Sequence, residues 1–169
     1  MATAQIPYLE CIRRTLDAAL TLRTFPSAVA ERHNKPEVEA GFSPELVLNP
    51  ITITRDDQER TLIEPSINST RVSVRFRKSD NMEEYLAKRF TSFITQRADQ
   101  FFVLRRKPIE DYDISFLITN DHTDTMLRGK IVDFIIQFMQ DVDKDLKDVK
   151  LQMNQRFRKV ATEWFTVLN

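Results

Sequence analysis

The pattern of apolar positions changes once along the C-terminal segment of the chain. Between Ile131 and Met139 only Asp133 and Gln137 are polar, so a helix here must be covered on most sides and belongs to a domain core. From Met139 onward the apolar residues narrow to a single stripe with steps of three and four residues, which is typical of a coiled-coil seam. The stripe consists of Met139, Val142, Leu146, Val149, Met153, Phe157, Val160, Trp164 and Val167.

One long helix is predicted from about Asn120 to the end of the chain. No proline follows Pro108 and the only glycine there is Gly129, so little would stop the helix. It would be roughly 70 Å long, whereas the rest of the chain forms a body only about 30 Å across. The distal half of the helix, within residues 121–169, is therefore expected to project and to bind a second polypeptide. The alternative is that the helix breaks near Lys150 and folds back.

The predicted partner-binding residues all lie on the narrow stripe. They are Val142, Leu146, Val149, Met153, Phe157, Val160 and Trp164.

The rest of the chain predicts two more helices and five strands. The helices are Pro7–Thr24 and Asp80–Ala98, and the strands are Leu46–Thr54, Arg60–Glu64, Thr70–Lys78, Phe101–Arg106 and Tyr112–Thr119. The segment Glu31–Glu39 is charged and predicted to be irregular, and Gly41–Pro44 to be a turn. Short connections between strands imply antiparallel pairing. We therefore expect a single α+β domain over residues 1–169, with two layers, helices on one face of the sheet, and the order α-βββ-α-ββ-α.

Composition supports a globular protein. Of 169 residues, 41% are hydrophobic and 30% are charged, and the apolar runs are too short to cross a bilayer. No secretory signal is expected. Cys11 is the only cysteine, which rules out an internal disulfide and fits a reducing compartment.

The charges sum to zero but form blocks. Arg71–Lys107 is mainly basic, Pro108–Asp148 mainly acidic, and Val149–Asn169 basic again. Such polarity favours oriented docking, although chance clustering screened by solvent is the alternative. The sharpest basic feature is the triplet Arg105, Arg106 and Lys107, which follows an apolar run. No standard nucleic-acid motif accompanies it, so we expect no nucleic-acid partner.

No pattern in the sequence predicts catalysis or a cofactor. Two glycines cannot build a phosphate-binding loop, and His33 and His122 have no second ligand at metal-binding spacing. Cys11 lacks a catalytic signature, and Asp111 and Asp113 lie in a predicted turn where carboxylates are usually solvated. We therefore predict that the protein is not an enzyme and binds no metal or cofactor.

Three stretches resemble a known family, subunit 4 of the actin-related protein 2/3 complex. They are Glu31–Glu39 (ERHNKPEVE), Ser66–Ser69 (SINS) and, above all, residues 101–120 (FFVLRRKPIEDYDISFLITN). The similarity continues through His122-Thr123 and Val132–Phe134 and extends over essentially the whole chain. It implies a two-layer α+β fold with a long C-terminal helix.

The resemblance also implies a function. Members of the family pair with a larger subunit of the complex, the 34 kDa subunit. The pair forms a scaffold for the actin-related proteins and the other subunits, and contributes to binding the mother filament during branched actin nucleation. The implied filament-binding residues are Arg105, Arg106, Arg156 and Arg158.

The family has no catalytic activity of its own, and its location is the cytoplasm and the actin cytoskeleton, with no membrane partner. The alternative is an adaptor or chaperone-like module whose C-terminal helix binds another protein client.

Overall fold

We describe the fold from a computed structural model of the chain. It describes residues 2–21, 36–40, 47–78, 80–96, 108–119 and 128–168. In chain order the elements are α1 (Ala2–Thr21), α3 (Glu37–Ala40), β1 (Ile51–Thr54), β2 (Arg60–Pro65), β3 (Ser69–Arg75), α4 (Asn81–Gln96), β4 (Ile114–Thr119) and α6 (Arg128–Leu168).

The four strands form one antiparallel sheet in the order β1-β2-β3-β4. Strands β1 and β2 form a hairpin, as the short connection between these two predicted strands implied. Its turn is held by Asp56 Oδ1, which accepts hydrogen bonds from the N–H groups of Gln58 (2.7 Å) and Glu59 (2.8 Å). Strands that follow one another among the described residues are neighbours in the sheet, and their predicted antiparallel pairing is confirmed.

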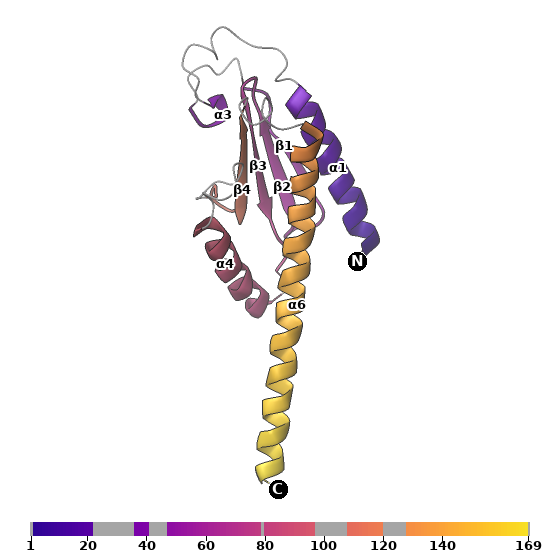
Figure 1. Ribbon diagram of the computed structural model, residues 1–169, viewed down its shortest axis with the longest axis vertical. Helices are drawn as coiled ribbons and strands as arrows, with labels where there is room; N and C mark the ends of the chain where they lie inside the picture. Colours follow the sequence, from indigo (N-terminus) through magenta and orange to yellow (C-terminus); the bar gives the residue numbers. More distant parts are fainter. Residues whose placement is uncertain are drawn as a thin grey trace.

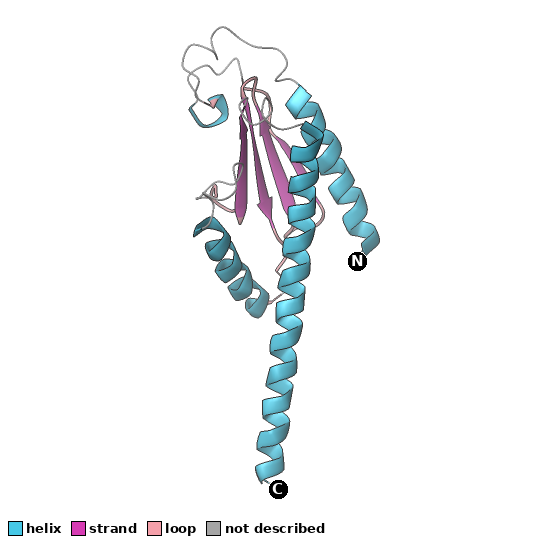
Figure 2. Ribbon diagram, viewed as in Figure 1, coloured by secondary structure: helices cyan, strands magenta, loops and turns pink. Residues whose placement is uncertain are grey.

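One face of the sheet forms the hydrophobic core. Side chains alternate between faces along a strand, and the register sets Ile63, Val72 and Phe116 side by side on the same face. Helices α1 and α6 pack over this face (Figures 1 and 2), and their buried residues join the strands in one cluster. The α1 contribution is Tyr8, Leu9, Ile12, Leu16, Ala19 and Leu20. The predicted α+β class with two layers is confirmed.

The opposite face of the sheet is polar. Ser73 and Ser115 are buried there, and their hydroxyls are hydrogen-bonded at 2.9 Å. Arg71 binds Glu64 with two parallel hydrogen bonds, at 2.8 and 2.9 Å. These pairs satisfy polar groups that would otherwise be costly to bury.

Helix α3 was not predicted, because the charged stretch around it has no apolar period. It forms one turn, in which the Ala40 N–H donates to the Pro36 carbonyl at 2.8 Å. Asn68 Oδ1 accepts a hydrogen bond from the Glu37 N–H at 2.9 Å, and the Ser69 hydroxyl accepts one from Val38. A tertiary contact with the start of β3 therefore stabilises this turn.

Some predicted boundaries were wrong. α1 begins at Ala2 and includes Pro7, and β1 begins only at Ile51, because Pro50 has no N–H to donate to the sheet. β4 begins at Ile114, since Tyr112 lies in a turn closed by its N–H to the Ile109 carbonyl, 3.2 Å.

The predicted start of α4 is confirmed, with Asp80 Oδ1 accepting the Glu83 N–H at 2.8 Å. The predicted strand Phe101–Arg106, the predicted turn Gly41–Pro44 and the predicted start of the long helix near Asn120 lie outside the described residues.

Candidate functional site

The long C-terminal helix is the candidate site. α6 runs without interruption over 41 residues, from Arg128 to Leu168, which corresponds to roughly 60 Å. Gly129 lies in its first turn and no proline interrupts it. The break near Lys150, which the sequence left open as an alternative, does not occur. Figure 1 shows the C-terminal part of α6 extending well beyond the sheet, away from α1 and α4.

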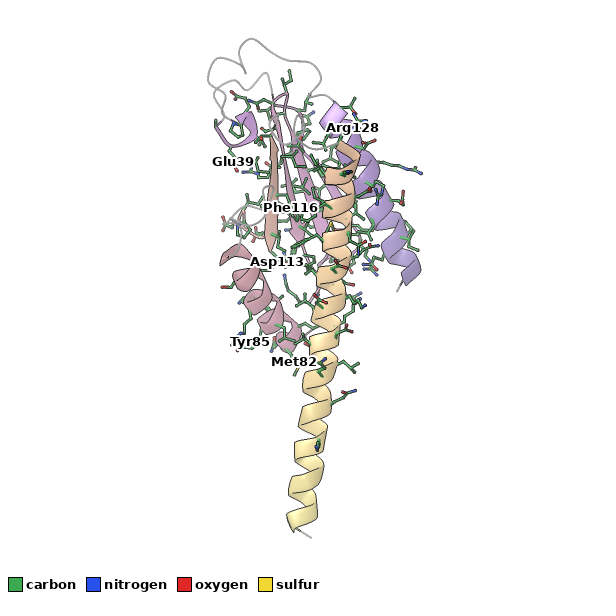
Figure 3. All side chains as sticks on the ribbon, in the orientation of Figure 1. Glu39, Met82, Tyr85, Asp113, Phe116 and Arg128 are labelled. Carbon is green, nitrogen blue, oxygen red and sulfur yellow. The ribbon has the colours of Figure 1, made fainter. Side chains whose placement is uncertain are left out.

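The proximal part of α6 is an integral part of the domain core. Ile131, Val132, Ile135, Ile136 and Met139 are all buried. Phe138 meets Phe116 of β4 edge to face, with ring centroids 5.4 Å apart, and Figure 3 shows Phe116 between the sheet and α6. Such an aromatic contact adds about 1 kcal/mol beyond the burial of the rings. This half of the helix therefore has a fixed position on the sheet.

Ion pairs at the surface align the proximal helix with α1. Arg128 Nε lies 3.0 Å from Asp17 Oδ1, and the Arg128 guanidinium also donates to the Thr21 hydroxyl at 3.0 Å. Arg13 pairs with Asp133 one turn further along. Because these pairs are solvent-exposed, each contributes little stability, but together they set the register of the two helices.

The stripe emerges from the core between Leu146 and Val149. Val142 is only 1% exposed and belongs to the core of the chain itself, and Leu146 packs against that core. Val149 is 42% exposed, and Leu151 is 58% exposed. The stripe residues up to Leu146 thus pack into the chain's own domain, and the stripe is exposed to solvent at Val149. Val142, the first residue of the predicted partner-binding stripe, is therefore buried in the chain's own core, and the exposed part of the stripe begins at Val149.

The distal stripe residues lie on the described backbone of α6. The side chains of Met153, Phe157, Val160 and Trp164 lie outside what the structure describes, so their place on one face follows from the helical period alone.

A charged cluster lies where α6 leaves the sheet. Arg55 and Glu59 form a half-buried ion pair at 3.0 Å, and Asp143, Lys147 and Leu146 of α6 line a hollow beside it. Burial raises the pKa of Glu59, the Asp143 carboxylate acts in the same direction, and Arg55 opposes them. The cluster therefore marks the boundary between the buried and projecting halves of α6.

The predicted filament-binding arginines are placed only in part. Arg156 and Arg158 lie on the distal half of α6, although their side chains are not described. Arg105 and Arg106 lie outside the described residues.

Sequence reasoning missed a second group of arginines. Arg60 and Arg75 face each other across β2 and β3, on the polar face of the sheet. A basic residue in each strand was visible in the sequence, but only the strand register brings the two together.

The described ranges contain neither a metal-binding group nor a helix that could span a membrane. No group of three or more His, Cys, Asp or Glu side chains in these ranges could hold a metal ion. None of the described helices combines the length and the hydropathy that a membrane span requires.

Comparison with known proteins gives a consistent result over the full length. A family model described as ARP2/3 complex 20 kDa subunit (ARPC4) matches residues 1–167. Actin-related protein 2/3 complex subunit 4 of Dictyostelium discoideum is 58% identical over 164 residues, which is 97% of each chain. The probable subunit 4 of Caenorhabditis elegans is 54% identical over 168 residues, or 99% of each chain, and that of Saccharomyces cerevisiae (strain ATCC 204508 / S288c) is 52% identical over 162 residues, or 95%.

Proposed function

Because the chain belongs to the family of the ARP2/3 complex 20 kDa subunit (ARPC4), we propose that it is a non-catalytic scaffold subunit of that complex. In this role it pairs with the 34 kDa subunit, the larger subunit of the pair. It also supports the actin-related proteins and the other subunits, and contributes to binding the mother filament. It acts in the cytoplasm, at the actin cytoskeleton.

One observation supports the pairing above all. The apolar stripe is buried by the chain's own domain up to Leu146 and exposed at Val149, while the helix continues to Leu168. Burial of each large apolar side chain contributes about 1.5 to 3 kcal/mol. The five stripe residues from Val149 to Trp164 therefore offer on the order of 10 kcal/mol to a partner helix. We assign that partner as the larger subunit.

The filament contact is assigned to four arginines, Arg105, Arg106, Arg156 and Arg158. Two of them precede the proline at position 108 and two lie on the distal half of α6, within the basic C-terminal block. Guanidinium groups suit an acidic protein surface such as that of actin.

The pairing is tested by the double substitution Phe157→Asp and Trp164→Asp. Binding of the larger subunit would have to remove water from two carboxylates in the stripe, so co-purification with that subunit should be lost. The matched control is Leu151→Asp with Gln155→Asp. These two exposed residues lie four apart, on the side of α6 opposite the stripe, and this control should retain the partner. Intact assembly of the seam variant would reject the proposed interface.

The filament contact is tested by Arg105→Glu with Arg106→Glu. The complex should still assemble, while branch formation on filaments, counted by fluorescence microscopy, should fall because the reversed charges repel an acidic surface. Arg14→Glu with Lys130→Glu reverses two exposed charges on α1 and α6 and serves as the control. Normal branching by the Arg105 and Arg106 variant would remove both residues from the filament surface.

A further inference from the structure

The polar face of the sheet holds two cations in a direct cross-strand pair. Arg60 of β2 and Arg75 of β3 are register partners, so their Cβ atoms lie about 5 Å apart. Like charges in this arrangement are destabilising. Both side chains are half-buried, which limits the screening of their repulsion by solvent.

Neighbouring cations of this face are neutralised, whereas this pair is not. Arg71 has its two hydrogen bonds to Glu64, and Lys78 lies 2.6 Å from Asp113 Oδ2. No carboxylate in the described part of the chain forms an ion pair with Arg60 or Arg75. This unpaired double charge lies where β2 begins and β3 ends, near cations that are paired with carboxylates.

The nearby carboxylates have other roles. Asp113 accepts hydrogen bonds from the Phe76 N–H at 2.8 Å and from Lys78, and Figure 3 shows it between the sheet and α4. Glu84 of α4 pairs with Lys88 at 3.8 Å. Neither carboxylate forms an ion pair with Arg60 or Arg75.

The surroundings position the two guanidinium groups for a ligand. Arg60 stacks over the ring of Tyr112, with its guanidinium carbon 5.3 Å from the ring centroid. Stacking holds the plane of the group and leaves the N–H donors at its edge available. Arg75 and Tyr112 line an open hollow between β3, α4 and the turn that precedes β4.

The charges around the hollow select the kind of anion. Its lining includes Glu84, Asp111 and Asp113 as well as Arg75, Lys78 and Lys88, so its overall charge is balanced. A polyanion such as a nucleic acid would meet these carboxylates as well as the arginines. A single carboxylate carries one charge and can accept a planar, two-pronged hydrogen bond from a guanidinium group.

We propose that Arg60 and Arg75 form a binding site for the carboxylate of an Asp or Glu side chain of another subunit. This deepens the proposed function and depends on it, since the partner is a member of the same complex. The contact lies on the polar face of the sheet, so it is separate from the seam of α6.

Crosslinking of the purified complex tests this site. Arg60→Lys and Arg75→Lys, made singly, keep the charge and introduce an amine that a carbodiimide couples directly to a neighbouring carboxylate. Mass spectrometry should find position 60 or 75 joined to an Asp or Glu of another subunit. Crosslinks only to residues of the same chain, such as Asp111, would overturn the proposal. So would no crosslink at these positions while Lys130 and other native lysines react.

A variant without the two charges measures how much the site contributes to retention of the chain in the complex. Arg60→Gln with Arg75→Gln should weaken retention of the chain in the complex by about tenfold or more, because the partner carboxylate is left without its donors. Arg14→Gln with Lys130→Gln removes the same charge elsewhere and should have no effect. Equal retention of both variants would overturn the proposal. Equal retention combined with reduced binding of a short DNA duplex would instead assign the pair to a polyanion.

This result can be separated from failure of the proposed function. If the chain is not a subunit of the complex, the wild-type chain itself will not purify with the other subunits. If only the arginine site is wrong, the complex will purify normally and the crosslink will be missing.

Discussion

Two valines on α6, seven residues apart, should respond very differently to the same substitution. Val142 is 1% exposed and lies in the core, whereas Val149 is 42% exposed. Changing either to alanine removes two methyl groups, worth about 0.8 kcal/mol each when buried. At Val142 the loss is about 1.6 kcal/mol, and the cavity left behind adds about 1 kcal/mol more. At Val149 the loss is below about 1 kcal/mol, because solvent already contacts the side chain.

Thermal unfolding of the purified chain measures this difference. For a protein of this size, 1 kcal/mol shifts Tm by about 2–4 °C, so Val142→Ala should lower Tm by about 5–10 °C and Val149→Ala by less than about 3 °C. In the assembled complex, Val149→Ala should reduce retention of the partner more than it reduces the stability of the domain. Equal shifts in Tm for the two variants would refute the reasoning that α6 passes from core to open surface between these residues.

Two further substitutions test the domain itself. Tyr8→Phe should lower the free energy of unfolding, measured by urea titration, by about 1–3 kcal/mol. The reason is that the buried Thr61 hydroxyl loses the Tyr8 hydroxyl, its hydrogen-bond partner at 2.7 Å. An unchanged free energy would mean that this hydrogen bond contributes nothing to stability. At Asp56, burial would raise the pKa, but hydrogen bonds from the Gln58 and Glu59 N–H groups and the nearby Arg77 and Arg55 more than offset it and lower the pKa. A lowered pKa stabilises the fold above the ordinary pKa of an aspartate, and this contribution is lost as pH falls through the folded-state value. Asp56→Asn should therefore reduce Tm at pH 7, and the difference from wild type should shrink at acidic pH below the usual range for aspartate. A difference that stays constant with pH would contradict the role of the charge.

Local patterns were sufficient to predict much of the fold. Val72 and Val74 alternate with polar residues in the predicted strand Thr70–Lys78, and β3 buries both on its core face. The second helix was predicted to start at Asp80, and the Asp80 side chain caps α4. These predictions succeeded because side-chain period and capping depend on residues close in sequence.

Other features depended on contacts between distant residues. α3 forms because Asn68 and Ser69 accept hydrogen bonds from its N–H groups, and these partners lie 31 residues away. The periodicity of apolar residues gives no information on contacts between residues so far apart in the sequence. Pro7 was predicted as the start of α1, but the helix begins five residues earlier, at Ala2.

The pattern of residues was sufficient to predict that α6 is one long helix whose wide apolar face narrows to a stripe. Helical period and the absence of proline are local properties, so both could be read without the fold. The sequence could not determine where the stripe stops serving the chain's own core, since that depends on how far the sheet and α1 extend along the helix. Only the tertiary structure placed this change between Leu146 and Val149. Only the strand register set Arg60 against Arg75, because pairing across strands is decided by the packing of the whole sheet.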